Sequence, residues 1–388
     1  MSMLERRRRL ARRHRLAPGT AAADPVEAAR SVIGLHATDP ASVILAALAR
    51  LAAPEVTAVE RALYEDRALV RMLGMRRTMF SVPTDFAPII QSACTRAIAV
   101  KERRQLLRFI EGGQVADDPA AWLAEVQDAV VRHLRAHGSA TANELSTAVP
   151  QMRAPLTLPG PGGQQVTQAI GPRVLFLLGA DGLIARGRPL GSWTSSLVRW
   201  HPIEAWLRNA PAEPPTEQAR IELVRRWLGA FGPGTLADLA WWTGWPVGDV
   251  KRALAGLEVL EVELDGGTGL VLADDLAPES TVRPFAALLP ALDPSVMGWK
   301  ARDWFLGDHA KALFDRNGNA GPTIWWDGRI VGGWAHRKDG EVAIRLLEDV
   351  GADATGAITA AADRLAGSVG KVRVTPRFRT PLEKELAA

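Results

Sequence analysis

Gly34-Leu35-His36-Ala37-Thr38-Asp39-Pro40 is the stretch of sequence that decides the fold, because it separates two helical segments. Residues 25–34 and 40–51 place apolar side chains with the period of a helix. Asp39 is a good N-cap, and Pro40 suits the first position of the second helix. The stretch therefore predicts a short connector between two capped helices.

The connector brings two polar side chains together. Alternate side chains of an extended segment share a face, so His36 and Thr38 are expected to face a common space while Ala37 turns into the core. A histidine and a hydroxyl presented in this way could position and activate one water molecule. The alternative is a purely structural role for His36, in which its ring is bound by a backbone carbonyl. Asp39 is better explained as a helix cap than as a catalyst.

The chain length of 388 residues indicates two to four small domains. The sequence has no apolar run long enough for a transmembrane helix, and its basic N-terminus lacks the apolar segment of a secretory signal. The single cysteine, Cys94, excludes internal disulfides and a four-cysteine zinc site. These features predict a cytoplasmic protein without a membrane partner.

The net charge is +4, and 40 of the 47 basic residues are arginines. Arginine suits bidentate contacts to phosphates, so the balance is compatible with nucleic acid. Codon bias is an equally simple explanation, since alanine, glycine and proline are also abundant. Two interpretations also remain open for the basic segment 4–16: an arm along a phosphate backbone, or a solvated helix face.

Three successive regions repeat one order of elements, three helices followed by a β-hairpin, which is typical of a winged helix. After residue 281 the pattern changes to short strands, which indicates a β-rich domain, a partly open barrel. The sequence thus predicts an α+β fold with four domains, residues 1–115, 116–210, 211–280 and 281–388. A helix at 166–179 and a basic strand at 371–379 are among the expected elements.

Arginines in the arm, in the predicted hairpins and in a Pro/Gly-rich loop at 150–165 are candidates for contacts with DNA. They are Arg12, Arg13, Arg76, Arg77, Arg153, Arg186 and Arg188. The glycines of that loop do not form a phosphate-binding motif, because the required Lys-Ser/Thr is missing. Trp241 and Trp242 are better explained as core residues than as base-stacking residues.

Five stretches in this order resemble the winged-helix DNA glycosylase family, whose members include AlkZ-like, YcaQ-like and AlkX-like proteins. They are residues 34–40, 75–83, 232–244, 289–293 and 327–334. The resemblance implies tandem winged-helix (helix-turn-helix) domains and a C-terminal β-barrel-like domain, C-shaped around a DNA channel. It also implies hydrolysis of the N-glycosidic bond of alkylated purines in base excision repair, with unhooking of interstrand crosslinks in some members.

The family's catalytic motif, Gln–apolar–Gln or Gln–apolar–Asp, falls at His36-Ala37-Thr38, which is similar to a further branch with His–apolar–Ser/Thr/Asn. The resemblance implies that His36 is a general base or water anchor and that Thr38 is its hydrogen-bond partner. The motif supplies no ligand set, so no metal or cofactor is expected. Lys101 is the first lysine of the chain, which argues against a Schiff-base lyase in this segment.

The predicted protein is therefore a monomeric, monofunctional DNA glycosylase whose partner is double-stranded DNA carrying N7- or N3-alkylated purines. When bound to DNA it would be associated with the nucleoid. The alternatives are a non-enzymatic winged-helix DNA-binding protein or regulator, and a relative that only shields damaged DNA. A glycosylase would place His36 and Thr38 on a basic concave surface, whereas a regulator would place recognition-helix arginines there.

Overall fold

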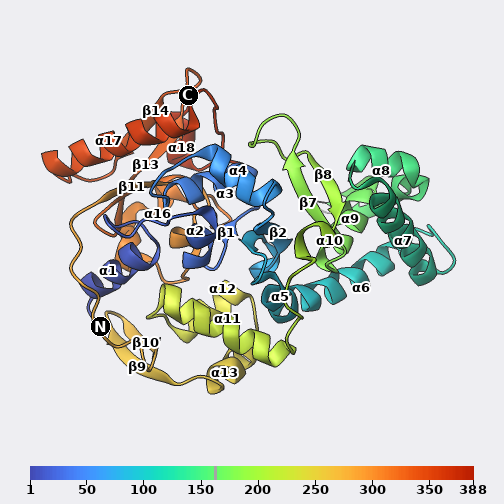
Figure 1. Ribbon diagram of the computed structural model, residues 1–388, viewed down its shortest axis with the longest axis horizontal. Helices are drawn as coiled ribbons and strands as arrows, with labels where there is room; N and C mark the ends of the chain where they lie inside the picture. The colour runs from blue at the N-terminus through green and yellow to red at the C-terminus, as the bar shows by residue number, and fades with distance from the viewer. Residues whose placement is uncertain (161–163) are drawn as a thin grey trace.

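The computed structural model describes residues 1–160 and 164–388, and it has a mixed α+β fold (Figure 1). Residues 161–163 of the predicted Pro/Gly-rich loop lie outside the described residues. In the described chain, no helix is both long and apolar enough to cross a membrane.

The first unit contains the connector. It consists of α2 (Pro25–Ser31), β1 (Leu35–His36), α3 (Pro40–Leu48), α4 (Val56–Tyr64), β2 (Leu69–Leu73) and β3 (Met79–Pro83). The three strands form one antiparallel sheet in the order β1-β3-β2. Three helices and a hairpin are present as predicted, and the connector itself supplies an additional strand. The helix α4 has no side-chain cap at its N-terminus.

The second unit follows two helices, α5 (Ala87–Ile90) and α6 (Arg96–Gly112). Its elements are α7 (Pro119–His137), β4 (Ala140–Thr141), α8 (Ala142–Ala148), α9 (Gly171–Ala180), β7 (Ile184–Pro189) and β8 (Val198–Pro202). The sheet order β4-β8-β7 is equivalent to that of the first unit. An antiparallel hairpin, β5 (Pro155–Pro159) and β6 (Gln165–Ala169), is inserted before α9. The helix expected at 166–179 therefore begins only at Gly171.

The third unit contains α11 (Thr216–Phe231), α12 (Leu236–Thr243), α13 (Val247–Ala255), β9 (Val259–Leu264) and β10 (Gly267–Leu272). Its two strands form an antiparallel hairpin, and Gly234 bridges to Leu270 as a rudimentary third strand. The short helix α10 (Glu204–Leu207) and residues 208–215 connect it to the second unit.

The C-terminal unit is built on a four-stranded antiparallel sheet in the order of the sequence. Its strands are β11 (Ala286–Leu289), β12 (Thr323–Trp326), β13 (Arg329–His336) and β14 (Val342–Leu346). Three short helices lie in the connection between β11 and β12: α14 (Pro294–Met297), α15 (Asp303–Leu306) and α16 (Ala310–Leu313). Two further helices pack against the strands: α17 (Ala352–Val369) and α18 (Pro381–Leu386).

The strands expected to make a partly open barrel form an open sheet in the described chain, with β11 and β14 as its unpaired edges and no closed barrel. The strand expected at residues 371–379 is wrong, because this segment leaves α17 and runs in irregular conformation past the connector, where the Arg377 N–H donates to Asp39.

Two hydrophobic cores lie within the described residues. One is shared by the first, third and C-terminal units, and the other joins α6 to the second unit. In Figure 1 the second unit accordingly extends to one side, while the other three are gathered around α1 (Met3–Arg13) and α2.

The shared core contains a polar network that ties three segments together. Arg50 and Asp293 form an ion pair with both side chains fully buried, at 2.8 Å. Arg50 also donates to Ser295 Oγ at 2.8 Å, and that hydroxyl contacts His14 Nδ1 at 2.8 Å. The basic segment 4–16 is thus anchored in the core at its C-terminal end rather than being a free arm.

Candidate functional site

The connector is held against β3 by a close backbone approach at Gly34. The φ angle of Gly34 is +144°, and a Cβ atom there would lie 2.8 Å from Val82 Cγ1, so this position favours glycine. His36 is paired with Phe80 across the sheet, and the Ala37 N–H donates to the Met79 carbonyl at 2.7 Å. Ala37 is fully buried, as expected.

His36 is buried and electrically neutral. Its side chain is 4% exposed, and its ring centroid lies 5.2 Å from that of Phe80. Burial, and secondly the positive charge of Arg76, lower the pKa of His36 to about 3. Its Nδ1 is buried and has no hydrogen-bond partner among the described residues. The ring is therefore not tied through Nδ1 to a backbone carbonyl, and the nitrogen retains its hydrogen-bonding capacity.

Thr38 is half-buried and lies two residues further along the chain, beyond the end of β1. Its Oγ1 accepts a long hydrogen bond of 3.4 Å from the Met79 N–H, which leaves the hydroxyl proton for another acceptor. Asp39 is a helix cap as expected, since its Oδ1 accepts from the Ala41 N–H at 3.1 Å. Its Oδ2 also accepts from the Arg377 N–H at 2.9 Å, which brings the C-terminal segment to the connector.

Three arginines lie close to these residues, Arg71, Arg76 and Arg377, and Arg302 lies close to Arg76. We call these four the connector arginines. Arg71 and Arg377 donate to the carbonyl oxygens of the connector, Ala37 at 3.0 Å and Thr38 at 3.4 Å. Within the described chain, none of the four forms an ion pair with a carboxylate. Their charges are thus available to an external anion.

Trp241 on α12 holds two of these guanidinium groups. The Arg76 guanidinium lies 3.8 Å from the centre of its ring system, and the Arg302 guanidinium lies 4.7 Å from it. Burial lowers the pKa of each arginine to about 10, so both remain cations at neutral pH. Trp241 is thus partly buried but not simply a core residue: it links the first unit to the C-terminal unit through two cation–π contacts.

The seven arginines selected from the sequence fall into two groups. Four are bound to carboxylates of the same chain: Arg12 (to Glu279), Arg13 (to Asp275 and Glu279), Arg77 (to Glu102) and Arg188 (to Glu60 and Glu65). Three have no ion-pair partner in the described chain: Arg76, Arg153 and Arg186. Arg153 is exposed, and Arg186 lines a cavity between the first and second units.

Sequence reasoning missed Arg71, Arg302 and Arg377 as neighbours of the connector. Arg71 has a local signal, because it lies in β2 opposite Ser81, and Ser81 in turn pairs with Leu35. Arg302 and Arg377 have no such signal, since they approach the site from a part of the chain more than 260 residues away.

The site combines a neutral histidine, whose Nδ1 has no hydrogen-bond partner, with guanidinium groups that form no ion pair. Such guanidinium groups can bind the phosphates of a substrate. The chain belongs to the AlkZ-like DNA glycosylase family, because the family model described as "DNA glycosylase AlkZ-like" matches residues 29–368. It is a member of a family of hydrolases that act on N-glycosyl bonds, and DNA is the substrate of the family.

The fold is similar to that of the solved Streptomyces sahachiroi DNA glycosylase AlkZ. The TM-score is 0.72, the sequence identity is 20%, and the match covers 97% of this chain and 99% of that one. No curated protein matches the sequence.

Proposed function

We propose that this chain is a monofunctional DNA glycosylase that hydrolyses the N-glycosidic bond of N7- and N3-alkylated purines, including those in interstrand crosslinks. The observation that carries the proposal is the neutral His36, with an unpartnered Nδ1, next to the Thr38 hydroxyl and four unpaired guanidinium groups. The protein would act as a monomer on double-stranded DNA.

His36 would act as a water anchor rather than as a strong base. A general base is most effective when its pKa is near the working pH, whereas burial lowers the pKa of His36 to about 3. A neutral imidazole can still accept a hydrogen bond from water and orient its oxygen. Thr38 would supply the second hydrogen bond, because its hydroxyl proton is not used by Met79.

The weak basicity of His36 is sufficient for the proposed substrate, an alkylated purine nucleotide. An alkylated purine is cationic and leaves readily, so the reaction requires an oriented water more than it requires proton abstraction. The sugar becomes positively charged as the bond breaks, and a neutral ring stabilises it better than an imidazolium would. The buried environment of His36 thus favours cationic leaving groups over normal bases.

The connector arginines would hold the phosphates on either side of the damaged nucleotide. Arg377 contacts the connector from the C-terminal unit, Arg76 lies close to His36 in the first unit, and Arg302 shares the Trp241 ring with Arg76. We propose that residues 1–115, 116–210 and 211–280 form three winged-helix domains that, with residues 281–388, enclose the DNA. The strand orders β1-β3-β2 and β4-β8-β7 support this assignment for the first two.

The alternative, a DNA-binding regulator, would use the third helix of the first unit to read bases. That helix is α4, and its Glu60 instead forms an ion pair with Arg188 of the second unit at 2.9 Å. Glu65, which directly follows the helix, also pairs with Arg188 at 2.9 Å. Its acidic side chains thus connect two units, which favours the glycosylase over the regulator.

The test is release of base from a duplex that contains N7-methylguanine, measured as abasic sites cleaved by alkali. Wild type should release the base without cleaving the strand itself. His36→Ala should lose release while binding undamaged duplex with wild-type affinity, and His137→Ala, which removes an exposed histidine of α7, should behave as wild type. Wild type that binds DNA but releases no base would support the regulator.

A further inference from the structure

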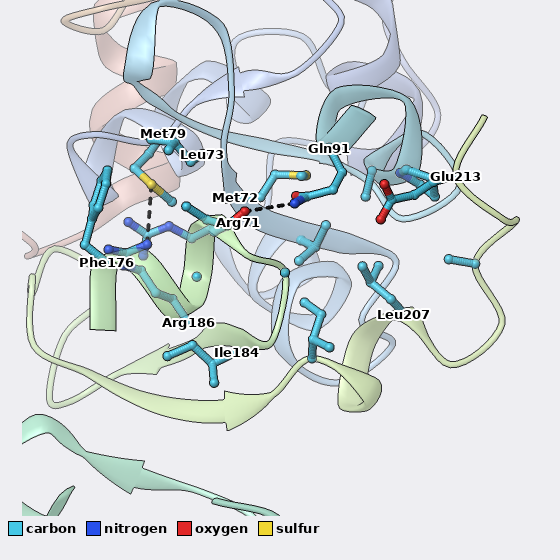
Figure 2. A pocket seen from close by; sticks show the side chains of 18 of the residues that line it. Arg71, Met72, Leu73, Met79, Gln91, Phe176, Ile184, Arg186, Leu207 and Glu213 are labelled. Atoms are coloured by element: carbon cyan, nitrogen blue, oxygen red, sulfur yellow. Dashed lines mark hydrogen bonds between the residues drawn. The ribbon is translucent and has the colours of Figure 1, made fainter. Parts of the chain in front are cut away.

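A cavity of about 300 Å³ lies between the first and second units (Figure 2), and of the residues assigned to the proposed reaction only Arg71 lines it. Its wall is largely apolar and comes from β2, β3, α9, β7 and α10. The apolar side chains that matter here are those of Met72, Leu73, Met79, Phe176, Ile184 and Leu207. The volume falls at the lower end of the range of small-molecule sites, about 300–1,000 Å³.

Two cationic side chains enter this apolar space. Figure 2 shows Arg71 and Arg186 pointing to the end of the cavity formed by Met79 and Phe176. Arg71 is 8% exposed, and its Nε is buried without a partner among the described residues. Arg186 lies over the Trp200 ring at 4.6 Å and contacts Met79 Sδ at 3.4 Å.

The two guanidinium groups repel one another. Burial, and secondly the charge of Arg71, lower the pKa of Arg186 to about 10, so it stays charged at neutral pH. In the described chain neither arginine forms an ion pair with a carboxylate. Glu213 lies at the rim, but it is exposed and bound to Arg96 at 2.6 Å. An anion between the two arginines would relieve their repulsion.

We propose that this cavity binds a small organic anion, a molecule with an apolar body and a carboxylate or similar group held by Arg71 and Arg186. A cationic alkylated base is excluded by the same two charges. The cavity shares a residue with the catalytic connector, because Arg71 also donates to the Ala37 carbonyl. The site is nevertheless distinct from the proposed glycosylase site, and its test reads binding rather than base release.

A DNA phosphate is the competing occupant of the two arginines. It fits less well, because a hydrated diester offers nothing to the apolar wall formed by Met72, Ile184 and Leu207. An apolar molecule with one acidic group would instead use both the guanidinium groups and this wall. The contribution of an apolar body to the binding affinity therefore distinguishes an organic anion from a DNA phosphate.

The experiment is calorimetric titration of the full chain with 2-naphthoate, with its neutral isostere 2-naphthamide and with 2-naphthylmethylammonium. Naphthoate should bind at least about tenfold more tightly than the amide, since a hydrogen bond to a charged group is worth roughly that factor or more, and the ammonium should not bind. Arg186→Gln should remove the preference for naphthoate. Leu207→Trp, which fills the cavity without touching the charges, should abolish binding of all three.

Arg104→Gln, which removes an exposed guanidinium group of α6 outside the cavity, is the matched control and should bind naphthoate as wild type does. Thermal melting of each variant verifies that it is folded. The proposal is overturned if naphthoate does not bind to wild type, or if it binds no better than the amide. The proposal is also overturned if inorganic phosphate or undamaged duplex displaces bound naphthoate with the affinity of naphthoate itself, which would indicate that the two arginines bind a DNA phosphate.

Discussion

Lowering the pH from 6.5 to 5 should destabilise the fold through two buried histidines, His14 and His36. Burial is the main cause that lowers the pKa of each to about 3, whereas a histidine of the unfolded chain titrates near about 6.5. Above pH 6.5 both states are neutral, and the full stability is present. Below it, the unfolded chain takes up protons that the folded chain does not, so stability falls as the pH falls.

The size of the effect follows from the length of the pH interval. Each histidine loses about 1.4 kcal/mol of stability per pH unit well below its unfolded pKa. Because the histidines of the unfolded chain are already half protonated at pH 6.5, the two together lose about 3 kcal/mol between pH 6.5 and pH 5. That loss is a large share of the about 5–15 kcal/mol by which proteins are stable. Burial also lowers the pKa of His201 and of His336, which adds to the effect in the same direction.

The assay is urea unfolding followed by tryptophan fluorescence at pH 7.5, 6.5, 5.5 and 5.0. The unfolding midpoint of wild type should fall steadily below pH 6.5. His36→Gln should lose about half of the decrease that the two histidines cause, while His137→Gln, which removes an exposed histidine, should follow wild type. A midpoint that is constant between pH 7 and pH 5, or a His36→Gln variant as sensitive as wild type, would refute the assignment of His36 as buried and neutral.

Three further predictions concern the packing around the site and its charges. Asp293→Asn should lower the free energy of unfolding by about 3–5 kcal/mol, measured by urea titration, because it leaves the fully buried Arg50 without a counter-charge; a loss below about 1 kcal/mol would show that solvent reaches the pair. Gly34→Ala should be destabilised in the same assay, since its Cβ would lie 2.8 Å from Val82 Cγ1; wild-type stability would contradict the close approach. Arg302→Gln should weaken binding to undamaged duplex and reduce the slope of log K against log salt by about 1, whereas an unchanged slope would remove Arg302 from the DNA contacts.

The connector could be predicted from the sequence because its determinants are local. The Asp39 carboxylate caps the helix that begins at Pro40, and Ala37 is buried, both as predicted, although His36 is buried as well. The order of three helices and a hairpin is also present in each of the three repeated regions. These features depend on capping and on hydrophobic period, which act over a few residues.

The charges of the site could not be predicted in the same way. The sequence predicts Arg13 and Arg188 as DNA contacts, but they are bound to Asp275 and Glu60, which are far away in the sequence. It also predicts a strand around Arg377, which instead contacts the connector from an irregular segment. Ion-pair partners are decided by tertiary packing, so composition identifies an arginine without showing whether its charge is already neutralised.

The open C-terminal sheet has a related explanation. Its short strands are present after residue 281 as the sequence predicts, but closure of a barrel requires pairing of the first strand with the last, and no local pattern encodes that pairing. In the described chain β11 and β14 are both packed against α17. This helix thus covers both edge strands of the open sheet.

The central claim is that the neutral His36 orients the water that displaces an alkylated purine. The most direct measurement is single-turnover release of N7-methylguanine from a duplex by wild type and by His36→Ala, with affinity for undamaged duplex measured in parallel. The account predicts release by wild type and a loss of about 10²-fold or more in His36→Ala at unchanged affinity. Release by His36→Ala at the wild-type rate would contradict it.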